Sequence, residues 1–253
     1  MTMTPRALGQ ELLESTLETA KRRGPLLRRY TVARLDDAGR EKITEHMAPA
    51  TTEFESAFNA FPRGVLITTE TGPCAIEDLR PGMKVETAEN GLQEVLWIGS
   101  MMMVPHAPVA DPAQVRMIRV SPDRFGLSRP AGDLMVGPGA RVLHFPDVLR
   151  DDDVRGRVYT PFTEFTDGDT VFEITPPSSI EVFHLCLAQH ATIQANGLPV
   201  ESFHPGYHIA DGMGPNKLAL FLSLFPHITA LRDFGLLAHP RMTLQSLMRL
   251  DAA

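Results

Sequence analysis

Cysteine is scarce in this chain, whose 253 residues include only Cys74 and Cys186. Two cysteines exclude a scaffold held together by several disulfides, and a chain of this length buries enough apolar surface to fold without them. Free thiols persist where the surroundings are reducing, so we expect a cytoplasmic location.

Positive charge is also in short supply. The chain carries 24 Lys and Arg against 31 Asp and Glu, for a formal net charge of −7. Such a chain has no general attraction for phosphate backbones or for acidic lipid headgroups. We therefore expect neither a nucleic acid nor a membrane as its partner.

Several recognisable signals are missing. The longest apolar stretches, such as residues 218–225, are too short to cross a bilayer. The N-terminal residues have no apolar core, which argues against a secretory signal. No Gly-x-Gly-x-x-Gly follows a predicted strand, and there is no Gly-x-Ser-x-Gly. Gly137-Pro-Gly139 is a poor anion cradle because Pro138 lacks a backbone donor. We expect no cofactor.

The first 59 residues are predicted to form an arm made of a helix and a β-hairpin. Residues 4–23 place leucines on one face and basic residues at the carboxyl end, as in an amphipathic helix. Residues 29–35 and 40–44 are predicted to be the two strands of the hairpin, joined by a turn at 36–39.

Residues 60–206 are predicted to be an all-β body, because short strand-forming segments recur between Gly, Pro and Asn. Asn90-Gly91 predicts a tight hairpin. Residues 105–114 and 151–153 are predicted to be exposed loops. The predicted strands are residues 65–69, 84–87, 94–98, 115–120, 134–136, 141–143, 170–174, 180–187, 191–195 and 198–203.

Residues 207–253 are predicted to be a helical extension. The segment 218–225 is too densely apolar to be left exposed, and residues 244–250 have the spacing of an amphipathic helix. We expect this extension to pack on the β body.

Two separated blocks carry a family resemblance. The first contains Phe61-Pro-Arg-Gly-Val-Leu-Ile-Thr-Thr69, Ala75-Ile-Glu-Asp-Leu-Arg-Pro-Gly82 and Val95-Leu-Trp-Ile-Gly99. The second runs from Val182-Phe-His-Leu-Cys-Leu187 through His190 to Ala195-Asn-Gly-Leu-Pro-Val-Glu-Ser-Phe-His-Pro-Gly206. Together they resemble the opening and closing strands of a Hint domain, the hedgehog/intein autoprocessing fold, in its bacterial stand-alone form. The resemblance implies a pseudo-twofold horseshoe of short strands whose two ends meet at a reactive centre.

The reactive positions that the resemblance implies are mostly occupied by residues unable to perform the family's chemistry. Ala60 stands where the family has a Cys or Ser nucleophile, and a methyl group cannot attack a carbonyl. Gly137 and Ala140 replace the Thr and His of the Thr-x-x-His element. The pair Glu201-Ser202 replaces the closing His-Asn, so Ser202 cannot form a succinimide. Of these family positions, His190 alone keeps its residue.

We therefore predict a Hint-like protein that does not process itself and acts as a binding or regulatory module for an unidentified protein or peptide at the Hint cleft. The alternative is divergent autoprocessing that uses Cys74 or Cys186 as nucleophile with help from His190. A small-molecule enzyme built on the same cleft is a third possibility.

A metal site is a further possibility, because five potential ligands lie within twenty-five residues: His184, Cys186, His190, His204 and His208. The spacings His184-x-Cys186 and His204-x-x-x-His208 do not match a zinc signature, and His190 is predicted to lie beyond a turn. We expect no metal, with His204 and His208 as polar turn residues.

Overall fold

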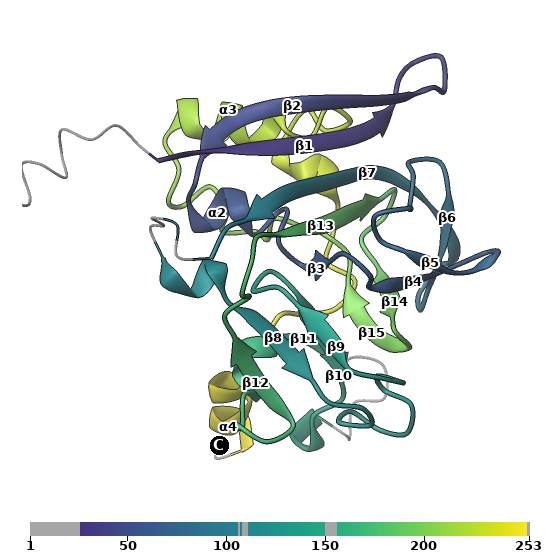
Figure 1. Ribbon diagram of the computed structural model, residues 1–253, viewed down its shortest axis with the longest axis vertical. Coiled ribbons are helices and arrows are strands. Elements are labelled where there is room, and N and C mark those ends of the chain that lie inside the picture. Colours follow the sequence, from purple (N-terminus) through teal and green to yellow (C-terminus); the bar gives the residue numbers. More distant parts are fainter. Residues whose placement is uncertain (1–25, 106, 108–110, 150–155, 252–253) are drawn as a thin grey trace, which may run out of the picture.

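The computed structural model describes residues 26–105, 107, 111–149 and 156–251. The helix predicted at residues 4–23 and the acidic run 151–153 lie outside these ranges. The described chain is mainly β, built from antiparallel strand pairs, which confirms the predicted fold class (Figure 1).

The strands form one large sheet and one small one. The large sheet has a main path β11-β10-β15-β14-β4-β6-β7-β1-β2, to which β13, β3 and β5 attach, and the small sheet has the order β12-β8-β9. The strands are β1 (Leu27–Leu35), β2 (Glu41–Pro49), β3 (Phe61–Pro62), β4 (Leu66–Thr69), β5 (Gly72–Ala75), β6 (Lys84–Thr87), β7 (Gly91–Met103), β8 (Met117–Val120), β9 (Leu134–Val136), β10 (Arg141–His144), β11 (Val158–Pro161), β12 (Val171–Ile174), β13 (Ile180–Leu187), β14 (Thr192–Ala195) and β15 (Leu198–Glu201).

The helices are short. The α-helices are α2 (Thr52–Glu55), α3 (Pro215–Ser223) and α4 (Leu244–Asp251), and the 3-10 turns are η1 (Pro112–Val115), η2 (Asp147–Leu149), η3 (Phe162–Phe165) and η4 (Leu231–Phe234). None of the helices in the described ranges is long and apolar enough to cross a membrane.

The predicted N-terminal hairpin is present as β1 and β2. The ladder between them runs from Leu35↔Glu41 to Leu27↔Pro49, so β2 continues well beyond the predicted end at residue 44. The other edge of β1 pairs with the long strand β7. The hairpin is thereby joined to the β body and forms one border of the large sheet.

Helix α3 packs on the sheet through an aromatic cluster. The buried Trp97 of β7 donates its indole N–H to the Leu224 carbonyl at 2.7 Å and stacks on Phe225 at 4.7 Å. Phe221 and Phe58 belong to the same apolar core. These contacts explain why the dense apolar run after residue 217 is not left in water.

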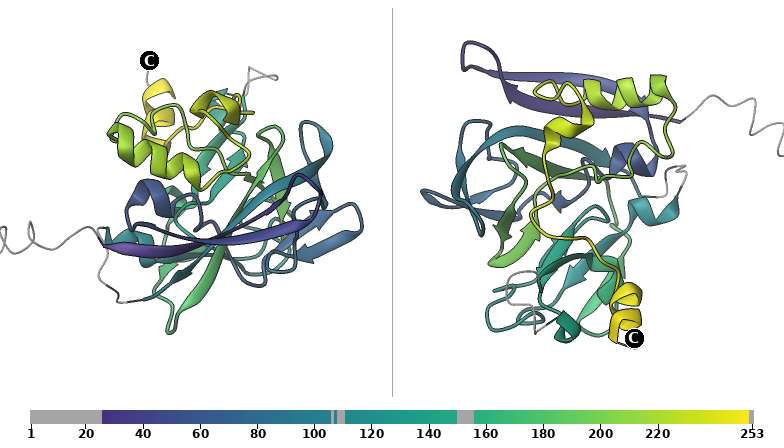
Figure 2. Two further views of the ribbon diagram at one scale, coloured as in Figure 1. Left: turned by 90° about the horizontal axis from the view of Figure 1, so that it is seen from above. Right: turned by 180° about the vertical axis from the view of Figure 1, so that it is seen from behind.

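Two segments differ from the predictions. Residues 112–115 form a 3-10 turn. Pro112 and Ala113 are exposed, but Gln114 is buried, so the prediction of an exposed loop was wrong at that residue, and Val115 belongs to the turn rather than to the predicted strand 115–120. Between η4 and α4 the chain is extended rather than helical. We call residues 236–243 the C-terminal strap; it crosses the back of the molecule from the side of α3 to α4 (Figure 2).

Candidate functional site

The two ends of the β body meet along one edge of β13. The Ala60 N–H donates to the Phe183 carbonyl at 3.1 Å, and the Phe203 N–H donates to the Leu185 carbonyl at 2.8 Å. Carbonyls two residues apart on a strand point to the same side, so both ends lie on the same edge. The ring of His184 lies between them, 5.5 Å from Phe61 and 5.3 Å from Phe203.

The Asn59–Ala60 peptide, which corresponds to the predicted reactive bond, is buried. Asn59 and Ala60 both have 0% exposure. The Ala60 carbonyl accepts the Gly137 N–H at 2.7 Å, and the Asn59 carbonyl accepts the Gly139 N–H at 3.4 Å. The Asn59 side-chain amide donates to Gln114 Oε1 at 2.9 Å. The peptide is therefore held by the backbone of the 137–139 loop on one side and by η1 on another.

The loop can approach this closely only because it lacks side chains. A Cβ on Gly137 would lie 1.8 Å from the Asn59 carbonyl oxygen, and a Cβ on Gly139 would lie 2.3 Å from Asn59 Oδ1. Both positions therefore require glycine for its size, and a threonine at 137 would not fit in this arrangement. Ala140, the next residue of the loop, is also buried.

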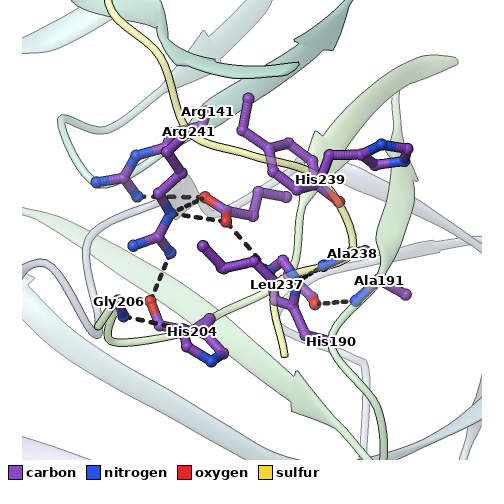
Figure 3. A network of polar contacts seen from close by, with 12 residues as sticks. Arg141, His190, Ala191, His204, Gly206, Leu237, Ala238, His239 and Arg241 are labelled. Atoms are coloured by element: carbon purple, nitrogen blue, oxygen red, sulfur yellow. Dashed lines mark hydrogen bonds and ion pairs between the residues drawn. The ribbon is translucent and has the colours of Figure 1, made fainter. Parts of the chain in front are cut away.

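Glu201 ends β15, and its carboxylate belongs to a polar network with Arg141, His190 and Arg241, which are labelled in Figure 3. Arg241 Nε lies 2.8 Å and Arg141 Nη1 lies 3.3 Å from its oxygens. His190 Nδ1 accepts the Ala238 N–H at 2.9 Å, which places the imidazole proton on Nε2, 3.1 Å from Glu201 Oε1. Burial alone would raise the pKa of Glu201, but His190 and the two guanidiniums outweigh it and hold the pKa well below its usual range.

Ser202 has a structural role, because it is hydrogen-bonded to Ala191 through both its backbone and its side chain. Its N–H donates to the Ala191 carbonyl at 3.0 Å, and its hydroxyl oxygen accepts the Ala191 N–H at 3.1 Å. The residue has 0% exposure. These two hydrogen bonds close the turn that brings His190 to Glu201.

The C-terminal strap lies over this network. Tyr159 of β11 pairs with the strap through the Pro240 carbonyl at 2.9 Å and the Met242 N–H at 3.0 Å. His239 Nε2 lies 2.9 Å from Glu89 Oε1, and Arg241 also donates to the His204 carbonyl at 2.6 Å. The strap therefore adds to the edge of β11 and covers His190 and Glu201.

Neither cysteine has the surroundings of a nucleophile. Cys74 lies in β5, and burial together with the nearby Asp78 raises its pKa. Cys186 is buried in β13 within the aromatic core, and burial raises its pKa far more. Both thiols are therefore protonated at neutral pH, whereas the thiolate is the reactive form.

The histidines considered as metal ligands have other contacts. Burial lowers the pKa of His184 to about 3, and it packs between aromatic rings. His204 Nδ1 accepts the Gly206 N–H at 2.9 Å, whereas the exposed His208 pairs with Asp211. Within the described ranges, no group of three or more His, Cys, Asp or Glu side chains could hold a metal ion.

Two groups of predicted site residues thus come together in the structure, and further residues join them. Ala60 meets the 137–140 loop, and His190 meets Glu201 and Ser202. The residues not anticipated are Arg141, Arg241, Glu89 and Gln114. A buried Glu in an apolar strand signals a cationic partner, but the sequence contains too many arginines to say which one.

A family model described as Hint domain matches residues 59–207, more than half of the chain. The chain belongs to the Hint domain family. Among solved structures it is similar to the bacterial intein-like domain from Clostridium thermocellum, with 13% identity, 57% of this chain and 99% of that chain covered, and a TM-score of 0.37. A DnaB intein from Synechocystis sp. PCC 6803 has 15% identity over 57% of this chain and 99% of that chain, with a TM-score of 0.36. No curated protein matches the chain.

One cavity of about 230 Å³ remains beside the polar network of this Hint domain. His190 and Phe203 line it from the β body, and His227 and Phe234 line it from the C-terminal extension. The Nδ1 atom of His227 is buried and has no hydrogen-bond partner within the described ranges.

Proposed function

We propose that this Hint domain does not cut its own chain at Asn59–Ala60 and acts as a binding module. The proposal rests on the buried Asn59–Ala60 peptide, which is held by the 137–139 backbone and has a methyl group where the family's nucleophile would stand. An acyl shift begins with a lone pair on the side chain that follows the peptide bond. Alanine has none, so the first step has no attacking atom.

The groups around the peptide do not replace the missing chemistry. The loss of a general acid or base costs about 10²–10⁴-fold in rate, and Ala140 and Gly137 supply neither. Glu201 is ionised and shared between Arg141 and Arg241, so its charge is already neutralised in the folded protein. We assign this network to holding the two ends of the β body and the strap together.

The cavity beside His190 is the docking position that we propose for the partner. Its walls are apolar apart from His190, His227 and Asp233. Such a cavity suits a protein or peptide partner that inserts one apolar side chain with a polar end toward His227. Ala188 lies exposed at its rim and is the natural position for a probe.

Intact-mass measurement of the full chain tests the absence of processing. Wild type and Ala60→Cys are incubated with and without dithiothreitol or hydroxylamine. We expect one uncut species for both, because a thiol at position 60 restores the nucleophile but not the acid at position 140. Wild-type fragments produced by cleavage of the peptide bond before residue 60, or before either native cysteine, would instead establish self-cleavage.

The binding role has its own test. A photo-crosslinking residue at Ala188 is compared with the same residue at Ala113, an exposed position on η1. We expect a discrete crosslinked partner from position 188 alone in the native cytosol. Equal or absent crosslinking at the two positions would argue against docking at this cavity.

A further inference from the structure

A second and larger cavity, of about 480 Å³, lies away from the Asn59–Ala60 peptide. Leu143 and His144 from the end of β10 and Leu198 from the start of β15 form part of its wall, with Phe125 and Arg129 from the loop after β8. Arg157, just before β11, completes the mouth. This volume is within the range of small-molecule pockets in proteins.

The two arginines that line this cavity, Arg129 and Arg157, form no ion pair with a described residue, unlike other arginines of this part of the chain. Arg116, Arg119 and Arg124 each lie within ion-pair distance of a carboxylate, namely Glu173, Asp133 and Asp167. Arg129 and Arg157 are exposed, and no ion pair joins either of them to a carboxylate in the described ranges. Two guanidiniums that line one cavity and have no ion pair among the described residues are suited to an anion, and a planar carboxylate can accept two parallel hydrogen bonds from a guanidinium.

Two phenylalanines give the cavity an accessible apolar surface beside the arginines. Phe125 is half-buried and Phe145 is exposed, whereas Leu198 and Leu143 are buried, and the Phe125 ring is fixed by an edge contact with Phe165 at 5.1 Å. Inorganic phosphate would leave this surface in water, so it gains nothing from these residues.

His144 adds an acceptor rather than a third positive charge. The Thr160 hydroxyl donates to the Met242 carbonyl at 2.8 Å, so its oxygen accepts from His144 Nε2 at 2.8 Å. His144 Nδ1 is then left without a proton, and burial lowers the pKa of this imidazole. The cavity is therefore lined by two cationic guanidiniums, two phenylalanine rings and an imidazole whose pKa is lowered by burial.

We propose that this cavity binds a small organic carboxylate with an apolar body, its carboxylate held by Arg129 and Arg157 and its carbon skeleton packed on Phe125 and Phe145. Binding at this cavity is independent of whether the chain cuts itself, because no hydrogen bond or ion pair in the described ranges joins the Arg129 or Arg157 side chain to Asn59, Ala60 or Glu201.

Calorimetric titration of the full chain with 3-phenylpropionate tests the proposal. We expect saturable binding at one site per chain, with shifts of the 143–145 amide signals in NMR spectra. The matched alcohol, 3-phenylpropan-1-ol, and inorganic phosphate should each bind at least tenfold more weakly, because each lacks one half of the recognised chemistry.

Single variants decide whether the arginines are responsible. Arg129→Gln and Arg157→Gln should each weaken binding about tenfold or more and leave the urea midpoint unchanged. Arg249→Gln is the control, since Arg249 is exposed on α4 and does not line the cavity. Unaltered affinity in both cavity variants, equal binding of the alcohol, or no binding up to millimolar concentrations would each overturn the proposal.

Discussion

Replacement of Arg241 by methionine removes the strap's guanidinium from Glu201 while keeping most of the side chain's apolar length. Removing one partner of a buried ion pair costs about 3–5 kcal/mol, since the other charge stays behind. Glu201 is 2% exposed but keeps Arg141 at 3.3 Å and His190 at 3.1 Å. We therefore place the loss in free energy of unfolding for Arg241→Met lower, at about 2–3 kcal/mol.

Urea unfolding followed by tryptophan fluorescence measures this loss, because the single Trp97 is buried against Phe225 and Leu224. In a thermal scan the same loss corresponds to a decrease in Tm of roughly 4–12 °C for a chain of this size. Hydrogen exchange gives a local readout: the amides of Tyr159 and Met242, which pair the strap with β11, should lose more protection than the amides of β7.

A matched control separates the buried pair from a general effect of removing an arginine. Arg232→Met removes a guanidinium whose side chain is 89% exposed and lies 3.8 Å from Asp233, and should change stability by less than about 0.5 kcal/mol. If Arg241→Met is no more destabilising than Arg232→Met, the strap is not anchored by Glu201, and the network has been misassigned.

Two further predictions concern the packing of the loop and the buried imidazoles. Gly137→Ala should lower the free energy of unfolding by about 1–3 kcal/mol, because its Cβ would overlap the Asn59 carbonyl. The control Gly132→Ala, with open space around it, should change the free energy of unfolding by less than about 0.5 kcal/mol. Equal urea midpoints for the two variants would contradict the close packing. Stability should also fall as pH decreases from about 6.5 toward 4. The unfolded chain takes up protons near pH 6.5, whereas the folded pKa of His184 is about 3. His184→Gln should flatten this dependence by roughly 3 kcal/mol between pH 6.5 and 4. His208→Gln, with a 90% exposed side chain, should not; identical pH profiles for the two variants would refute the assignment.

Local sequence patterns predicted most of the strands because the relevant information is local. Turn residues such as Asn90-Gly91 end one strand and begin the next, and Gly91 adopts the left-handed φ of +63° that this hairpin requires. The very short strands were harder to anticipate. β3 contains two residues, Phe61–Pro62, and exists because it pairs with β13, more than a hundred residues later in the chain.

The strap could not be predicted from its own residues. Segment 236–243 has neither the alternation of a strand nor the spacing of a helix, and it is extended because Tyr159 and Glu201 provide partners for it. Likewise, the buried side chain of Gln114 accepts from the distant Asn59 amide at 2.9 Å in addition to its bonds with the neighbouring Asp111, and no local pattern indicates that long-range partner. Long-range pairing of this kind decides local structure without leaving a local pattern.

Ala60 and the glycines of the 137–139 loop belong to one packing arrangement around the Asn59–Ala60 peptide. A side chain at 137 would push against the Asn59 carbonyl, and the loop's own N–H groups already occupy both carbonyls of the Asn59–Ala60 unit. A nucleophile restored at position 60 would therefore face a carbonyl that is buried and has no side-chain acid at position 140 beside it. The Glu201 carboxylate is held between the guanidiniums of Arg141 and Arg241, so it is not free to transfer a proton during self-processing. The hydrogen bonds from the 137–139 loop also fix the start of the β body, so the absence of cleavage that we propose has the same physical origin as the packing of this peptide.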